Sequence, residues 1–216
     1  MYLQESYSYK TVFYHFHRWS KLGIWQSIWI ELLSSNKKIL NCLSLQLDGS
    51  QTVVKGAIES VGYQGRKKAK TSSQLFLCDK NGVILSFSEV MSGHHHDVYQ
   101  IQKQFKILLE KLMMLGIEVN GLIINADAAF DCVELRKICA QYGIECNFRL
   151  NPKNGKSNER NDYYDEQFYA HRYVIERTFA WMDAFKILLI RFEKTTQNWI
   201  SFILLACITL TIRQFK

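Results

Sequence analysis

Apolar residues recur at every third or fourth position over several stretches of the chain, the spacing of one face of an α-helix. The clearest stretch lies between Asp97 and Leu115, and Gly116 follows it as a C-terminal stop. A second helix is expected from about Cys132 to Tyr142, ending at Gly143, and helical spacing resumes from Glu166 to Ile190. The chain therefore alternates helices with other elements.

Shorter segments between these helices have the alternation or the bounded apolar runs of β-strands. They are Leu43–Leu47, Gln74–Cys78, Val83–Val90, Val119–Ala126 and Glu145–Leu150. The second and third flank Lys80-Asn81-Gly82 and predict a hairpin. The first ends at Asp48 and the fourth reaches Asp127, so each places a carboxylate at a predicted strand end. This order of strands and helices predicts an α/β fold.

The first part of the chain has a different pattern. Aromatic and aliphatic residues keep helical spacing from Tyr9 to Leu33, with an interruption at Gly23, and predict two short helices. They are either a truncated DNA-binding helix-turn-helix or a helical hairpin that packs on the main domain. Asn36-Lys37-Lys38 is the best boundary, which divides the chain into a helical segment, 1–36, and a main domain, 37–216.

The charge balance changes the expectation about partners. The 216 residues carry a formal net charge of +7, which favours a polyanion such as nucleic acid. Basic side chains gather in two predicted loops: Arg66, Lys67, Lys68 and Lys70 in the first, and Lys153 and Lys156 in the second. Each loop either holds phosphates or is a plain solvated loop.

Other features point to a protein of a reducing cytoplasm. No CxxC pair and no signal-peptide pattern is present, and Cys132, Cys139 and Cys146 lie among apolar residues, so we expect buried thiols and no zinc site. The most apolar segment, Trp199–Ile212, falls short of the about 20 apolar residues that a membrane span needs. We interpret it as a buried terminal helix and expect no membrane association.

Three acidic residues are the candidate catalytic centre. Asp48 and Asp127 stand at predicted strand ends, and Glu176 lies in a helical stretch with an apolar face. Converging carboxylates suit Mg²⁺ or Mn²⁺, and a pair of such ions stabilises both oxygens of a phosphoryl displacement. Taken singly, the same residues also fit a turn, a helix N-cap and a solvated charge. His94-His95-His96-Asp97 is interpreted as a loop with Asp97 as a helix N-cap, because consecutive histidines cannot all face one ion.

Several motifs resemble the transposases of bacterial insertion sequences, in particular the insertion-sequence-five group. They are Thr11–Trp19, Leu47-Asp48-Gly49-Ser50, Asn125–Asp131 and Arg172–Trp181. Tyr169, Arg172 and Glu176 also have the spacing of that family's glutamate block. The resemblance implies a ribonuclease-H-like fold, in which a five-stranded mixed sheet is flanked by helices. It also implies that Asp48, Asp127 and Glu176 form a DDE triad that binds two Mg²⁺ or Mn²⁺ ions.

The resemblance also implies a reaction and partners. A water, and later a DNA 3′-hydroxyl, would attack a phosphodiester at the ends of an insertion sequence, so the partners are transposon-end and target DNA. Arg172 would contact DNA phosphate, with Tyr169 near it on one helix face. A homo-oligomer on DNA and a location at the bacterial nucleoid are expected.

The chain departs from the family pattern at three places. Asp183 stands where the family has a lysine, Ala128-Ala129-Phe130 follows Asp127, and few residues precede Thr11, which suggests a split reading frame with a partner chain. Two alternatives therefore stay open: a ribonuclease-H-like nuclease without strand transfer, and an inactive DNA-binding transposase remnant.

Overall fold

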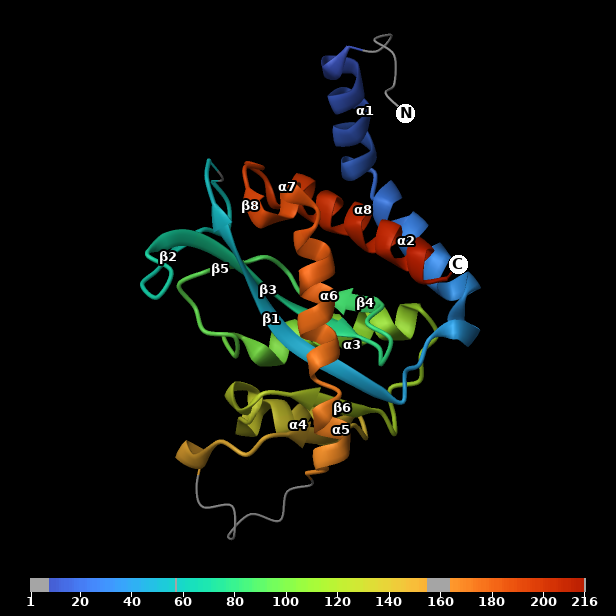
Figure 1. The fold of residues 1–216 in the computed structure, drawn as a ribbon, viewed down its shortest axis with the longest axis vertical. Coiled ribbons are helices and arrows are strands. Elements are labelled where there is room, and N and C mark those ends of the chain that lie inside the picture. The colour runs from blue at the N-terminus through green and yellow to red at the C-terminus, as the bar shows by residue number, and fades with distance from the viewer. Residues whose placement is uncertain (1–7, 57, 155–163, 216) are drawn as a thin grey trace.

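The computed structural model describes residues 8–56, 58–154 and 164–215 and shows one mixed β-sheet with helices on both faces (Figure 1). The predicted α/β class is confirmed. The strands are β1 (Ser44–Val54), β2 (Gly62–Gln64), β3 (Ala69–Cys78), β4 (Ile84–Phe87), β5 (Met91–Ser92), β6 (Ile123–Ala126), β7 (Glu145–Phe148) and β8 (Ile190–Arg191). The main path runs β2-β3-β1-β6-β7, while β4 and β5 pair with β3 and β8 pairs with β1.

Strand direction places β1 at the centre of the sheet. It pairs antiparallel with β3 and parallel with β6, and β6 pairs parallel with β7. In the β1–β6 pair, Gln46 lies opposite Asn125, so Asp48 and Asp127 each follow that rung by two residues. The adjacent strands thus place the first two predicted acids side by side.

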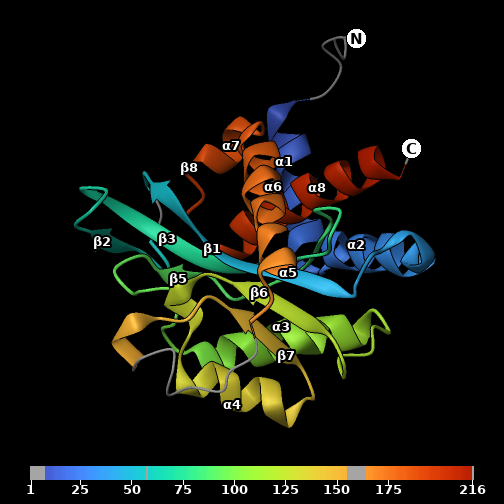
Figure 2. The ribbon, with the colours of Figure 1, turned by 60° about the horizontal axis from the view of Figure 1, so that its bottom comes forward.

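Helices cover both faces of the sheet (Figure 2). They are α1 (Tyr9–Lys21), α2 (Ile24–Ser35), α3 (Ile101–Met114), α4 (Val133–Gln141), α5 (Glu166–Ala170), α6 (Tyr173–Asp183), α7 (Lys186–Leu189) and α8 (Thr196–Gln214), with 3₁₀ turns η1 (Lys37–Ile39), η2 (Ala128–Phe130) and η3 (Pro152–Asn154). α3 and α4 lie on one face, and α6, α7 and α8 lie on the other. The apolar faces of both helical layers are buried against the sheet.

The N-terminal helices pack on the C-terminal one. Phe16 of α1 stacks on Phe202 of α8 with 4.5 Å between ring centroids, and Trp29 of α2 stacks on Phe87 at 5.3 Å. Gly23 joins α1 and α2 with φ +67°, a backbone conformation that favours glycine. The far end of α1 extends away from the rest of the molecule (Figure 1) and leaves Tyr9, Val12 and Phe13 exposed.

Strand β1 is longer than its sequence predicts. The alternation of leucines ends at Leu47, and Asp48-Gly49-Ser50 has turn composition, but the strand continues to Val54. Pairing with β3 continues from Gln46 to Val53, and those ladder hydrogen bonds outweigh the local turn preference. Asp48 therefore lies within the strand, not at its end, and the predicted strand-end position is wrong for this residue.

Two predicted helices also differ in their ends. α3 begins at Ile101 after Gln100, so the expected N-cap role of Asp97 is wrong, although its loop is present. The stretch after Glu166 is not one helix, because α5 ends at Ala170 and α6 begins at Tyr173. Tyr169 and Glu176 therefore do not share a continuous helix face.

The C-terminal helix is largely buried against its neighbours, as the sequence indicates. None of the helices in the described part of the chain is long and apolar enough to cross a membrane. All six cysteines are free. Cys139 and Cys146 are buried thiols, as predicted, whereas Cys132 is only partly buried.

Candidate active site

The helix α6 crosses β1 (Figure 1), and Asp48 of β1 contacts Arg172 at the start of that helix. The Asp48 carboxylate is 18% exposed and accepts a hydrogen bond from the Gly49 N–H at 2.8 Å. The strand fixes its Cα within a ladder of backbone hydrogen bonds, so the carboxylate has a rigid base.

Asp127 follows β6, directly beside β1. Its backbone stays extended, with φ −72° and ψ 175°, and its Oδ1 caps the 3₁₀ turn η2 by accepting from the Ala129 N–H at 2.8 Å. The N-cap interpretation and the active-site interpretation are thus compatible, because the second oxygen, Oδ2, faces a different partner.

That partner is Arg172, which joins all three predicted acids. Its Nη2 donates to Asp48 Oδ2 at 3.1 Å and to Glu176 Oε1 at 3.4 Å, and its Nη1 lies 3.8 Å from Asp127 Oδ2. The guanidinium is 14% exposed, whereas Glu176 is 66% exposed. One buried cation therefore stands at the point where the carboxylates converge.

Burial dominates the electrostatics of this cluster. It raises the pKa of Asp48 from the ordinary 3.8 to about 6, although Arg172 and the Gly49 N–H both favour the charged form. The negative charges of Asp127 and Asp97 add to the rise. The site thus concentrates negative charge that its single arginine offsets incompletely.

Asp97 is a fourth acid that the sequence did not assign to the site. Its Oδ1 would lie 2.6 Å from a Cβ added at Gly49, so the loop carboxylate packs on the strand backbone beside Asp48. Burial, followed by the charge of Asp127, raises the pKa of Asp97. The available signal was Gly49 itself, since a glycine after a strand-borne aspartate permits such a close approach.

The first basic loop lies beside these acids. Arg66 and Lys67 line a groove of about 400 Å³ along β1, together with Gly49 and Asp97. Lys67 Nζ donates to the Gln51 carbonyl at 2.7 Å, and burial, then the charge of Arg66, lowers its pKa. These two residues can reach a phosphate near the acids.

The remaining predicted DNA-binding residues are placed less centrally. Lys68 lies in the turn between β2 and β3, Lys70 lies in β3, and both are exposed. Lys153 lies in η3, between Asp127 and Glu176 in the chain, and Lys156 lies outside the described residues. Tyr169 on α5 packs against Tyr164, with 5.5 Å between ring centroids.

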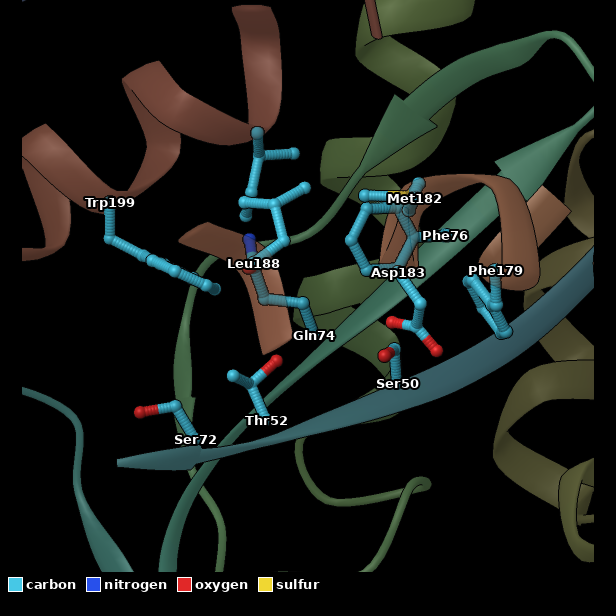
Figure 3. A pocket seen from close by; sticks show the side chains of 11 residues that line it. Ser50, Thr52, Ser72, Gln74, Phe76, Phe179, Met182, Asp183, Leu188 and Trp199 are labelled. Atoms are coloured by element: carbon cyan, nitrogen blue, oxygen red, sulfur yellow. The ribbon is translucent and has the colours of Figure 1, made fainter. Parts of the chain in front are cut away.

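A small polar cavity continues the face of β1 beyond Asp48. It measures about 30 Å³, and Ser50, Thr52 and Gln74 line its sheet side beneath α6, α7 and α8 (Figure 3). Figure 3 shows the carboxylate of Asp183 pointing toward Ser50. Such a volume suits about two water molecules, so we interpret the cavity as a hydrated continuation of the strand face.

The donor set fits a hard divalent cation. Within the described residues, no three Asp, Glu, His or Cys side chains are already spaced as the ligands of one ion, because the Arg172 guanidinium stands between the acids. Asp48, Asp127 and Glu176 nevertheless offer carboxylate oxygens alone, the ligands that Mg²⁺ and Mn²⁺ prefer. In the metal-free structure the Arg172 guanidinium is the positive group that offsets the repulsion between these carboxylates.

Comparisons with known proteins agree with this geometry. Residues 40–211 match the family described as DDE superfamily endonuclease. A search of curated proteins gives no significant sequence match. The family match includes all three acids and Arg172, and it covers most of the chain.

Solved structures show the same fold. The piggyBac transposase synaptic complex with hairpin DNA gives a TM-score of 0.50 at 12% identity, covering 81% of this chain and 46% of that one. The Mos1 transposase paired-end complex with the left transposon end gives 0.39 at 12% identity, covering 98% and 65%. The isolated Mos1 mariner catalytic domain gives 0.38 at 10% identity, covering 97% and 98%. With a mixed sheet flanked by helices and a likeness to the piggyBac structure, the chain has the predicted ribonuclease-H-like fold. It covers less than two thirds of the piggyBac chain and of the chain in the Mos1 paired-end complex.

Proposed function

Because the chain belongs to the DDE superfamily of endonucleases, we propose that it is a transposase catalytic domain that cleaves DNA at the ends of an insertion sequence and transfers the cut strand. Structures with a similar fold come from transposases bound to transposon-end and hairpin DNA, which supports this substrate. The net charge of +7 also suits a polyanion.

The convergence of Asp48, Asp127 and Glu176 on one guanidinium carries the proposal. The three acids belong to a central strand, a neighbouring strand and a helix, so local sequence alone does not bring them together. Their close approach is unfavourable because like charges repel. A structural role would be served better by apolar side chains at the buried Asp48 position. Such an arrangement is typical of a site for polyanion chemistry with cations.

The three carboxylates would hold Mg²⁺ or Mn²⁺, in two ions by the family resemblance. Bound ions of this kind offset the charge on the attacking and leaving oxygens of phosphodiester cleavage. Asp48 and Asp127 provide rigid ligands because their strands are hydrogen-bonded neighbours. Glu176 is the adaptable ligand, since its side chain is mostly exposed.

Basic residues around the acids would position the DNA. Arg172 partly offsets the charge of the carboxylates in the metal-free protein and would turn to a DNA phosphate when cations replace it, with Tyr169 close by on α5. Arg66 and Lys67, in the groove along β1, would hold the phosphates of the strand that enters the site. Lys68, Lys70, Lys153 and Lys156 would add contacts farther out.

The wider biological setting follows from the resemblance to insertion-sequence transposases. We expect a homo-oligomer on paired DNA ends, as well as a partner chain from a split reading frame that supplies end recognition. The place of action would be the bacterial nucleoid. The helix α1, which carries Lys10, Arg18 and Lys21 among aromatic residues, would contribute DNA contacts of its own.

Cleavage of labelled DNA tests the proposal. Wild-type protein with Mn²⁺ should nick duplex DNA that carries the inverted repeats flanking its gene, and E176Q should lower the rate by at least about 100-fold. Glu110, an exposed acid on α3 on the opposite face of the sheet, provides the matched control E110Q, which should cleave normally. Undiminished cleavage by E176Q would contradict the assignment.

A nuclease without strand transfer is the second candidate. Asp183 favours it, because a carboxylate beside the groove of Arg66 and Lys67 repels phosphate where the family has a lysine. Adding a supercoiled target to the same reaction separates the two functions. Joined products support the transposase, and cleavage without joined products supports the nuclease.

A further inference from the structure

A row of buried amides crosses three strands directly beneath the acids. Gln46 on β1, Asn125 on β6 and Asn147 on β7 occupy paired positions, and all are fully buried. Asn125 Nδ2 donates to Ser44 Oγ at 2.8 Å, and Asn147 Nδ2 donates to Asn125 Oδ1 at 2.7 Å. Strand interiors normally carry apolar side chains, so polar residues at neighbouring rungs need a reason.

The row ends on the segment that leads to Glu176. Asn147 Nδ2 also donates to the Asp165 carbonyl at 2.8 Å, and its Oδ1 accepts from the Asp165 N–H at 2.7 Å. Asp165 is in turn the N-cap of α5, where its carboxylate accepts from the Gln167 and Phe168 N–H groups. Asn147 therefore binds the backbone at the start of α5 with a donor and an acceptor together.

This double contact fixes the direction of the whole row. The Asp165 N–H can only donate and its carbonyl can only accept, so the Asn147 amide has one orientation. Its remaining N–H then meets the Asn125 oxygen, which turns the Asn125 amide nitrogen toward Ser44. Aspartate lacks the donor, leucine lacks both groups, and glutamine is too long, which explains asparagine at these positions.

The geometry relates the row to each part of the site. Asp48 and Asp127 each lie two residues beyond a member of the row, which is about 6.6 Å along an extended strand and on the same face. Arg172 and Glu176 follow Asp165 through α5 and the turn into α6. The amides thus link the two strand acids to the helical segment that supplies the third acid and the arginine.

We propose that Asn147 and Asn125 are positioning residues, which set the register at which Asp48, Asp127 and Glu176 meet. The role rests on the proposed function, since it concerns the same metal-binding acids. Neither asparagine contacts the acids, so each acts through the backbone: Asn125 through β6, and Asn147 through Asp165 and α5. Removing the row should loosen α5 and weaken cation binding without removing any ligand.

Asn147→Leu in the full chain tests this role, with Mn²⁺ binding followed by electron paramagnetic resonance and α5 followed by hydrogen exchange. N147L keeps the number and branching of the side-chain heavy atoms but removes the amide donor and acceptor, and it should raise the Mn²⁺ dissociation constant by about tenfold or more. Peptides covering residues 164–172 should exchange faster. Ile124→Ala, a buried change in β6 next to Asn125 but outside the row, is the matched control for lost stability.

The control should melt at a lower temperature yet bind Mn²⁺ within about twofold of wild type and keep its exchange in 164–172. Equal Mn²⁺ affinity in N147L and wild type, or an equal loss in I124A, would overturn the positioning role. If N147L does not fold, Ser44→Ala at the other end of the row is the test variant. We expect S44A to weaken Mn²⁺ binding by at least about twofold. Unchanged Mn²⁺ binding in S44A would contradict the positioning role.

Failure of the proposed function gives a different result. Wild-type protein that binds no Mn²⁺ would remove the metal site itself. Hydrogen exchange in residues 164–172 would then be the test of the positioning role. Faster exchange in N147L but not in I124A supports that role, and unchanged exchange in N147L overturns it.

Discussion

At the scale of single residues, the charges of three carboxylates, of which Asp48 alone is largely buried, are set against one guanidinium. Asp48 is the most buried of the three acids. Its raised pKa of about 6 shows that Arg172 does not fully offset the loss of hydration. Glu176 is mostly exposed and contributes less strain. The stability of the metal-free protein should therefore depend on the protonation of Asp48.

Asp48→Asn should stabilise the metal-free protein, and more so at neutral than at acidic pH. Because the folded-state pKa is raised, the wild-type side chain costs nothing below about pH 4 and loses stability as the pH rises from about 4 to 6. The asparagine does not titrate. Urea unfolding in EDTA should show D48N gaining on the order of 2–3 kcal/mol over wild type between pH 4 and pH 7. A difference that stays constant with pH would show that Asp48 is not strained.

Residue patterns predicted the acids but not their immediate surroundings. The motifs around Asp48, Asp127 and Glu176 are local and visible in the sequence. The approach of Asp97 to Gly49 and the contact of Arg172 with Asp48 join residues far apart in the chain, the latter 124 positions apart. Such contacts depend on how strands and helices pack, which local spacing does not encode.

At the scale of elements, α6 must be held at a fixed height over the sheet because it carries Glu176. Thr178, two residues after Glu176 and fully buried, supplies such an anchor. Its Oγ1 lies 3.0 Å from the Gly82 carbonyl, in the turn before β4, and also reaches the Val174 carbonyl of its own helix. The β3–β4 turn and α6 are thereby joined by a side chain.

Thr178→Val should destabilise the fold by about 1–3 kcal/mol, because the isosteric valine leaves the Gly82 carbonyl without its side-chain partner. Thr209 is a matched control, since its hydroxyl reaches just the Leu205 carbonyl of its own helix. T209V should change the free energy of unfolding by less than about 0.5 kcal/mol. Equal effects in urea titrations would mean that Thr178 does not anchor α6.

Element order was predictable from periodicity, whereas element ends were not. The helix at Ile101–Met114 and the strand at Ile123–Ala126 lie within their predicted ranges because their apolar faces are continuous. β1 extends beyond its predicted end at Leu47, because pairing with β3 stabilises its polar half. The strands β2, β5 and β8 are too short to show a period and arise from pairing alone.

At the scale of the whole molecule, the sheet separates two kinds of surface. α3 and α4 close one face, and α6, α7 and α8 cover the other (Figure 2). Arg172 at the start of α6 contacts the three acids, and Arg66 and Lys67 line the groove along β1. The positive net charge would draw DNA toward the protein, and the local acids would then need cations to admit a phosphate. Cation binding and DNA cleavage are therefore expected to depend on the same three carboxylates.

Mn²⁺ binding by wild type and Asp127→Asn tests that dependence most directly. Asp127 makes the longest of the three contacts with Arg172, so its membership in the site is the most open to challenge. Electron paramagnetic resonance should show Mn²⁺ binding to wild type and to the control E110Q, and a dissociation constant at least about tenfold higher for D127N. Equal Mn²⁺ affinity in D127N and wild type would contradict a metal site built from Asp48, Asp127 and Glu176.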